Sequence, residues 1–276
     1  MIPDIEPVIR IIRETAASEI MPRFCSLSAN DITKKRSGDL VTSADINAEK
    51  RLESSLNSLI SNSLIVGEEG ADADPRRLDA LKGEAPVWLI DPVDGTTNFV
   101  RGIPCFAVII AFCIGGETLA AWIHDPIADV TIWAAKGEGA WIGKGDGAGK
   151  QPIAVTTALS IGQMLGSLND RMCRKLATLR EAGKRDIPTG TRYGCAGREY
   201  MDLGRGELNF SLYGGRLMPW DHAAGVLIHS QAGGYSALTG DGSPYRPTTF
   251  GMHSNTALLL APDKESWQSL RQLING

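Results

Sequence analysis

The stretch Val87-Trp-Leu-Ile-Asp-Pro-Val-Asp-Gly-Thr-Thr-Asn-Phe99 is the most informative part of the chain. Its four apolar residues, followed by proline and glycine, predict a buried strand. Asp91 and Asp94 therefore come where a buried strand ends, and a glycine and two threonines follow them. Two carboxylates beside hydroxyl groups and a glycine turn suit oxygen coordination of a metal ion and contact with phosphate. The stretch thus indicates metal-assisted chemistry on phosphate.

The composition is that of an ordinary globular protein. The chain has 276 residues, 43% hydrophobic and 22% charged, with a formal net charge of −4. This length allows one large domain or two modest ones. A dedicated binder of nucleic acid or of a membrane surface usually carries basic clusters, so nucleic acid is not an expected partner. The one dense basic run, Lys34-Lys35-Arg36, is interpreted as a solvated loop.

The cysteines and the apolar segments bear on the compartment. The five cysteines are odd in number and form no C-x-x-C pair, which argues against a disulfide framework and against a zinc site. Asp4, Glu6 and Arg10 interrupt the apolar core that a signal peptide would need. No segment approaches the ~20 apolar residues of a membrane span. We expect a cytoplasmic protein with reduced thiols and no membrane attachment.

Apolar periodicity predicts the secondary structure of the first half. Helices are expected over 4–20 and 44–60, a loop or extended hairpin over 30–43, a strand over 63–66 and a short helix around 75–81. Strand-like runs follow the central stretch at 105–114, 118–124, 129–135 and 139–143. Their close spacing, with turn residues between them, predicts an antiparallel meander.

The second half alternates between strands and helices. Expected strands are 152–156, 163–168, 207–212, 234–238 and 256–260, and expected helices are 170–182, 197–204, 221–232 and 263–274. This mixture predicts a layered α+β fold. The glycine-rich stretch 143–149 is interpreted either as a boundary between an N-terminal half, 1–150, and a C-terminal half, 151–276, or as a flexible hairpin tip.

Three more acidic residues are candidates for the site, and each also has a structural explanation. Glu68 belongs to a Glu-Glu-Gly turn, which is commonly solvated. Asp221 precedes a helical run and is a good N-cap. Asp45 forms a T-x-x-D capping box with Thr42. Taken singly, none of the three establishes a catalytic site.

The paired aspartates are harder to explain by a turn alone. Like charges so close together raise each other's pKa unless cations neutralise them. The acids Glu68, Asp91, Asp94 and Asp221 carry four negative charges together, which two divalent cations would balance. Mg2+ binds in proteins through carboxylates, water and substrate phosphate.

The motifs together resemble the inositol monophosphatase family. They are Asp39-Leu-Val-Thr42-x-x-Asp45, Gly67-Glu68-Glu69, Asp91-Pro-Val-Asp-Gly-Thr-Thr-Asn-Phe99 and Pro219-Trp220-Asp221-x-Ala-Ala-Gly225, closed by Ala232-Gly233-Gly234. They occur in order from about residue 5 to 262, nearly the whole chain. The resemblance implies a layered αβαβα sandwich, usually a homodimer, that hydrolyses small phosphate monoesters with Mg2+ and is inhibited by Li+.

The resemblance also implies a role for each matched position. The implied ligands of two or three Mg2+ ions are the side chains of Glu68, Asp91, Asp94 and Asp221 and the carbonyl of Val93. Thr96 and Asp45, with Glu68, are the implied catalytic residues, which position a water for in-line attack on phosphorus. The implied substrate contacts are Asp94, Gly95, Thr96, Thr97, Gly194, Cys195, Ala196 and Asp221. Most ligands thus lie in the N-terminal half, whereas the C-terminal half supplies Asp221 and substrate-side residues.

The sequence offers no pattern for a covalent nucleophile. None of the five cysteines begins the C-x5-R loop of cysteine phosphatases, and neither HExxH nor G-x-S-x-G occurs. The four histidines are interpreted as structural, although His222 could support its neighbour Asp221. They are His124, His222, His229 and His253.

Two departures from the family pattern leave the substrate open. Gly214 stands seven residues before Asp221, where inositol-type members commonly have an acid that contacts the polyol. Arg101 replaces a histidine that often follows the Asn-Phe pair, and Arg101, Arg198 or Arg216 could meet a more anionic substrate. The substrate could be inositol monophosphate, histidinol phosphate, a sugar phosphate or bisphosphate, or less readily a nucleotide 3′-phosphate. Some bacterial relatives act as partners of transcription or ribosome machinery, which is the alternative from another functional class.

Overall fold

The computed structural model describes residues 2–275 apart from 36, 158 and 251–256. The helices are α1 (Ile5–Thr15), α2 (Ser43–Asn57), α3 (Glu68–Ala73), α4 (Thr96–Val100), α5 (Asp170–Glu181), α6 (Ala196–Gly204), α7 (Pro219–Gln231) and α8 (Lys264–Asn275). The strands are β1 (Ile32–Lys34), β2 (Leu40–Thr42), β3 (Leu64–Gly67), β4 (Val87–Asp94), β5 (Ala107–Ile114), β6 (Glu117–Asp125), β7 (Val130–Ala135), β8 (Ala140–Lys144), β9 (Ala148–Pro152), β10 (Leu165–Ser167), β11 (Thr189–Thr191), β12 (Phe210–Tyr213), β13 (Tyr235–Leu238) and β14 (Leu258–Ala261).

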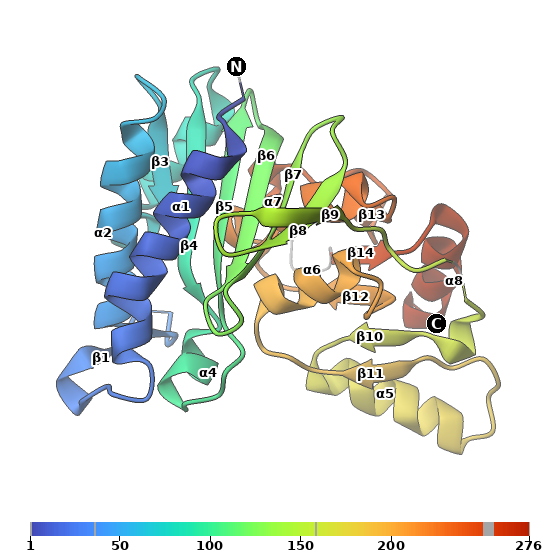
Figure 1. The fold of residues 1–276 in the computed structure, drawn as a ribbon. Helices are drawn as coiled ribbons and strands as arrows, with labels where there is room; N and C mark the ends of the chain where they lie inside the picture. The colour runs from blue at the N-terminus through green and yellow to red at the C-terminus, as the bar shows by residue number, and fades with distance from the viewer. Residues whose placement is uncertain (1, 36, 158, 251–256, 276) are drawn as a thin grey trace.

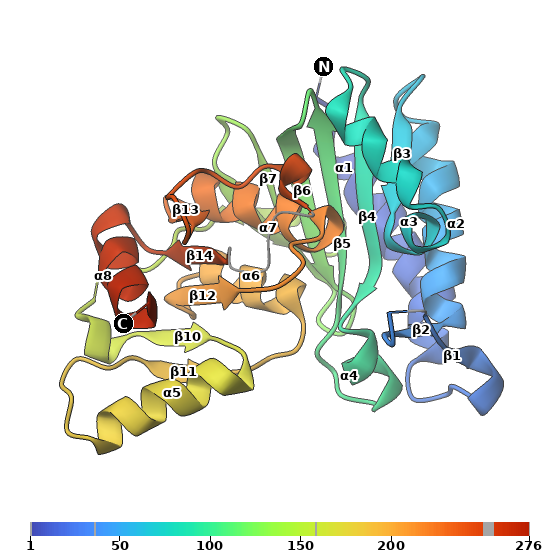
Figure 2. The ribbon, with the colours of Figure 1, turned by 180° about the vertical axis from the view of Figure 1, so that it is seen from behind.

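Helical layers alternate with the two large sheets of the molecule (Figure 1), and a separate two-stranded sheet pairs β1 with β2. Helices α1 and α2 cover one face of a seven-stranded sheet, ordered β3-β4-β5-β6-β7-β8-β9. Helices α6 and α7 lie on its other face, between it and a five-stranded sheet ordered β11-β10-β12-β14-β13. Helices α5 and α8 cover the far side of this second sheet, as the reverse view also shows (Figure 2). The expected αβαβα sandwich is confirmed.

Alternating side chains explain why both faces of the first sheet are covered. Along β4, Leu89 belongs to the core beneath α7, whereas its neighbours Trp88 and Ile90 belong to the core beneath α1 and α2. In the second sheet, Leu259 faces α8 and its neighbours face α7. The continuous apolar run 87–90 of β4 is therefore buried on both sides of the sheet, as its sequence predicted.

The predicted antiparallel meander is confirmed. The main errors of the secondary-structure prediction lie at short or polar segments. Strands β4 to β9 pair antiparallel in sequence order, and only β3 joins parallel, on β4. The stretch 143–149 turns between β8 and β9 inside this sheet, so the hairpin interpretation holds at that point. The strand predicted at 152–156 is wrong, since β9 ends at Pro152. The short strand β11 and helix α3 were not predicted.

The predicted helix over 4–20 also changes character partway. Helix α1 ends at Thr15, and the chain continues through a π-helical turn, Ala16–Ile20, that keeps Ile20 buried. The short helix predicted near 75–81 is a 3-10 helix, Pro75–Lys82. Within the described residues, no helix combines the length and apolarity needed to cross a bilayer.

Candidate active site

A bulge at the end of β4 turns Asp91 and Asp94 toward the same side. Asp91 pairs with Ile109 and Asp94 with Ala107, so three steps along β4 match two along β5. Residues three apart in a regular strand face opposite sides, and one extra residue cancels this alternation. Both aspartates consequently line one cavity, which regular strand geometry would not allow.

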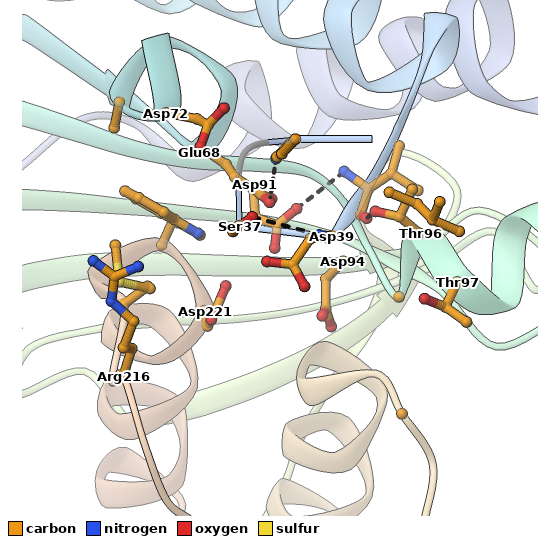
Figure 3. A pocket seen from close by; sticks show the side chains of 18 of the residues that line it. Ser37, Asp39, Glu68, Asp72, Asp91, Asp94, Thr96, Thr97, Arg216 and Asp221 are labelled. Atoms are coloured by element: carbon orange, nitrogen blue, oxygen red, sulfur yellow. Dashed lines mark hydrogen bonds and ion pairs between the residues drawn. The ribbon is translucent and has the colours of Figure 1, made fainter. Parts of the chain in front are cut away.

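The cavity has a volume of about 470 Å³ and collects acids from separate parts of the chain (Figure 3). Glu68 enters it from the start of α3 and Asp221 from the first turn of α7. The predicted residues that line the cavity are Glu68, Asp91, Val93, Asp94, Gly95, Thr96, Thr97, Gly194 and Asp221. Asp39 and Asp72, to which the sequence analysis gave no role, line it too.

Helix α7 leaves the Asp221 carboxylate free for the cavity. The helix begins at Pro219, with Met218 as its N-cap, and Asp221 is its third residue. The N-cap interpretation of Asp221 is therefore wrong, because Met218 occupies the N-cap position of α7.

The electrostatics of the acids favour a bound cation. Burial, and then the charges of Glu68 and the neighbouring aspartates, raise the pKa of Asp91 and of Asp221 well above the ordinary range. Burial also raises the pKa of Asp94, against hydrogen bonds that lower it. Carboxylates that lose water and face like charges need a counterion, and an all-oxygen donor set of this kind fits Mg2+.

A lysine supplies one counterion in this structure. Lys35 Nζ lies 2.7 Å from Glu68 Oε1 and 2.7 Å from Glu69 Oε1, with its side chain only 5% exposed. The solvated-loop interpretation is therefore wrong for Lys35. Lys34 is exposed as expected, but it ends strand β1 and does not belong to a loop. Arg36 lies outside the described residues. No three His, Cys, Asp or Glu side chains in the described part of the chain converge tightly enough to hold an ion as they stand.

Thr96 and Asp45 are in contact, as the resemblance implied. The Thr96 hydroxyl oxygen lies 3.2 Å from Asp45 Oδ1 and 3.0 Å from the carbonyl oxygen of Val93. Its single proton can satisfy only one of these acceptors at a time. Asp45 Oδ2 accepts hydrogen bonds from the backbone N–H and the hydroxyl of Thr42, so the capping box is also present. Burial raises the pKa of Asp45 to about 6.

The turn after the aspartates depends on Gly95. Its φ of 88° lies in the left-handed region, which favours glycine. This conformation reverses the chain from β4 into α4 and leaves Thr96 and Thr97 at the edge of the cavity.

The segment 194–196 lies partly behind the acids. Gly194 lines the cavity, but Cys195 and Ala196 are not among its lining residues. The Cys195 thiol donates to Asp94 Oδ2 over 3.0 Å, and the Gly197 N–H donates to the same oxygen over 2.5 Å. These contacts orient Asp94, and substrate contact by Cys195 and Ala196 stays a prediction.

The three candidate arginines differ in their surroundings. Arg198 is ion-paired with the buried Asp125. Arg101 is exposed and is not a lining residue of the cavity. Arg216 lines the cavity on the side of Asp221 (Figure 3), and no ion pair to it occurs among the described residues. Arg216 is therefore the arginine best placed to meet a substrate.

The histidines and cysteines lie outside the cavity lining where they are described. His222 Nδ1 is 3.1 Å from the Tyr200 hydroxyl, and His124 Nδ1 is 3.0 Å from the Thr131 hydroxyl. His229 is buried, and His253 lies outside the described residues. All five cysteines are free thiols.

Comparison with known proteins agrees with this geometry. A model of the inositol monophosphatase family matches residues 4–268. A fructose-1,6-bisphosphatase/inositol-1-monophosphatase of Thermotoga maritima is 30% identical over 208 residues, 74% of each chain. A Nus factor SuhB of Escherichia coli is 30% identical over 240 residues, 85% of this chain and 84% of the relative. The solved structure of an IMPase from Thermotoga maritima has a TM-score of 0.77 at 24% identity, and the match covers 97% of this chain and 94% of that one. The chain belongs to the inositol monophosphatase family.

Proposed function

We propose that the protein is a Mg2+-dependent hydrolase of a small phosphate monoester, similar to inositol monophosphate, that releases inorganic phosphate. The observation that carries the proposal is the bulge in β4, which brings Asp91 and Asp94 into one cavity with Glu68 and Asp221. A cytoplasmic homodimer sensitive to Li+ is part of the same proposal, by analogy with the family.

The carboxylates of Glu68, Asp91, Asp94 and Asp221, with the carbonyl of Val93, would hold two or three Mg2+ ions. Bound there, Mg2+ supplies a more acidic water and neutralises charge on the phosphate and the leaving oxygen. The buried carboxylates are suited to this because their own repulsion falls when a cation binds.

Thr96, Asp45 and Glu68 orient the attacking water in this proposal. The Thr96 hydroxyl can donate to Asp45 and accept a hydrogen bond from a water on the cavity side. Asp45 holds that hydroxyl in place, because its second oxygen is fixed by Thr42. Backbone N–H groups after Gly95 would meet the phosphate oxygens.

The substrate's alcohol portion would lie toward Gly194, Gly214 and Arg216. Chain neighbours aside, no heavy atom of the described residues lies within 4 Å of the Cβ position that a side chain at Gly214 would have. An acid there would have room, and its absence removes a possible acceptor for substrate hydroxyls. The alternatives are therefore histidinol phosphate and a sugar phosphate or bisphosphate, with a nucleotide 3′-phosphate less favoured.

A panel of these substrate types, assayed for phosphate release with Mg2+, with a chelator and with added Li+, tests the proposal. We expect turnover of at least one monoester that requires Mg2+ and falls with Li+. Metal-independent turnover would overturn the mechanism. Gly214→Glu should raise activity on inositol monophosphate relative to the other esters, and an unchanged ratio would contradict the role given to this position.

A second candidate is a regulatory partner of the transcription or ribosome machinery. The relatives named Nus factor SuhB favour it, at 30% to 32% identity. Pull-down of that machinery, together with complementation by Asp91→Asn, separates the two candidates. Full biological function of a catalytically inactive Asp91→Asn protein would favour the regulatory role.

A further inference from the structure

Glu49 is a buried carboxylate that binds the turn carrying Glu68. It lies in the middle of α2 and is 4% exposed. Its Oε2 accepts the backbone N–H of Glu69 over 2.8 Å, and its Oε1 accepts that of Gly70 over 2.7 Å. A carboxylate held by two N–H donors is a strong, directional contact. Glu49 therefore joins α2 to the first turn of α3, where Glu68 is the first residue.

This contact replaces a cap that α3 lacks. The N-cap of α3 is Gly67, which offers no side-chain hydrogen bond to the helix. The N–H groups of a first helical turn have no partner within the helix and need one from elsewhere. Glu49 provides it from a different helix, so the orientation of α3 depends on the position of α2.

The space for a side chain at residue 67 is limited by the Glu49 carboxylate and not by the local backbone conformation. Gly67 has φ −92° and ψ 159°, an extended conformation that any residue adopts. A Cβ atom at this position would overlap the Glu49 carboxyl carbon and lie 2.7 Å from Oε1. The carboxylate thus occupies the space that a side chain at 67 would need.

Helix α2 carries Asp45, one of the groups proposed to orient the water, as well as Glu49. Asp45, which contacts Thr96, lies one turn before Glu49 on the same helix. Residues four apart share a helix face, so one rigid element fixes the position of Thr96 through Asp45 and that of Glu68 through Glu49. The parallel pairing of β3 with β4 places Gly67 beside Ile90, one residue before Asp91.

We propose that Glu49 is a positioning residue of the active site, which directs the Glu68 carboxylate into the metal cavity by anchoring the N–H groups of Glu69 and Gly70. The inference rests on the proposed function, because it gives Glu68 a part in binding the cation. Glu49 itself is not a lining residue of the cavity, so its effect must pass through the β3–α3 turn.

The test compares Glu49→Ala and Glu49→Gln with Glu53→Gln as the matched control. Glu53 lies one turn further along α2 and pairs with Arg77 over 2.9 Å, away from the cavity. Mn2+ binding, followed by electron paramagnetic resonance, reports the site without activity. We expect Glu49→Ala to weaken Mn2+ binding by about 10-fold, since losing a residue that orients a metal ligand typically has this effect. Glu49→Gln should show a smaller loss, and Glu53→Gln none.

Kinetics supply the second readout. In Glu49→Ala, kcat should fall and the Mg2+ concentration for half-maximal rate should rise about 10-fold, with KM for substrate nearly unchanged. Gly67→Ala should displace the carboxylate and give the same defect, and the double variant should lose little more than either single one. If Glu49→Ala fails to fold, the measurements on Glu49→Gln and Gly67→Ala decide whether Glu49 positions Glu68.

Wild-type Mn2+ affinity in folded Glu49→Ala and Glu49→Gln, with only a lower Tm, would overturn the inference and leave Glu49 as a structural cap. Additive losses in the double variant would also overturn it. Absence of phosphatase activity in the wild type would instead refute the proposed function, and the Mn2+ measurement would still decide the role of Glu49.

Discussion

The ammonium group of Lys35 bridges Glu68 and Glu69, 2.7 Å from an oxygen of each. Lys35 comes from the turn after β1, and the two glutamates open α3, so the pair links segments more than thirty residues apart. The ammonium neutralises a carboxylate that the proposed function gives to Mg2+. Lys35 would therefore compete with a cation that binds Glu68.

Lys35→Gln should lower the Mg2+ concentration needed for half-maximal phosphate release, because it removes this competitor. Without metal, the variant should have a lower Tm, since the clustered carboxylates lose their counterion. A Mg2+ titration of activity and a thermal melt with chelator measure the two effects. Lys34→Gln, a change at the exposed neighbour, is the control. A raised or unchanged Mg2+ requirement in Lys35→Gln would contradict the competition.

Arg216→Gln should reduce kcat/KM for a substrate with a second anionic group more than for a simple monoester. A hydrogen bond to a charged group is worth about 1.5–3 kcal/mol, so the loss on fructose 1,6-bisphosphate should be about 10-fold or more. Inositol monophosphate should be nearly unaffected. Arg101→Gln, outside the cavity lining, is the control. Equal effects on both substrates would show that Arg216 does not select for charge.

Glu199→Gln should change how stability depends on pH. Glu199 is 7% exposed and accepts a hydrogen bond from Ser167, and burial raises its pKa to about 7 from an ordinary 4.5. Between these values the folded state keeps a proton that the unfolded state has lost, so the wild-type free energy of unfolding falls as pH rises through this window. Above about pH 7 both states are ionised and the effect levels off.

The Glu199→Gln variant has no carboxyl group at this position to titrate. Relative to the wild type, its free energy of unfolding should therefore gain up to roughly 3 kcal/mol between pH 4.5 and pH 8. Urea denaturation at several pH values measures the difference. Parallel curves for the two proteins would mean that Glu199 titrates near its ordinary pKa in the folded state.

Local patterns were enough to predict most of the fold. Strands β4 to β8 and helices α5 to α8 have apolar spacing strong enough to locate them within a few residues. Strand β11 was not predicted because Thr-Gly-Thr carries no apolar pattern, and its place depends on pairing with β10 and on contacts from α5. The strand predicted at 152–156 is wrong because β9 ends at Pro152 and one further backbone hydrogen bond, from the Ile153 N–H to the Ala140 carbonyl of β8, closes the pairing, although apolar residues continue.

The site was predictable where a motif is local and not where it depends on distant contacts. The resemblance pointed to Glu68, Asp91, Asp94, Thr96 and Asp221, and all five line one cavity. The bulge that aims the two aspartates depends on β5, and no pattern within β4 shows it. The parts played by Lys35 and Glu49 depend on contacts across 33 and 20 residues, beyond the reach of periodicity.

Whether the acids of the cavity bind a catalytic Mg2+ is tested by phosphate release from the wild type and from Asp91→Asn across a Mg2+ titration, with a chelated control. We expect wild-type turnover to rise with Mg2+ and to disappear with chelator. Asp91→Asn, shown to be folded by circular dichroism, should stay at least 1000-fold less active at every Mg2+ concentration, which corresponds to about 4 kcal/mol of lost transition-state stabilisation. Turnover that persists in chelator, or equal turnover in Asp91→Asn, would contradict this catalytic role of Mg2+.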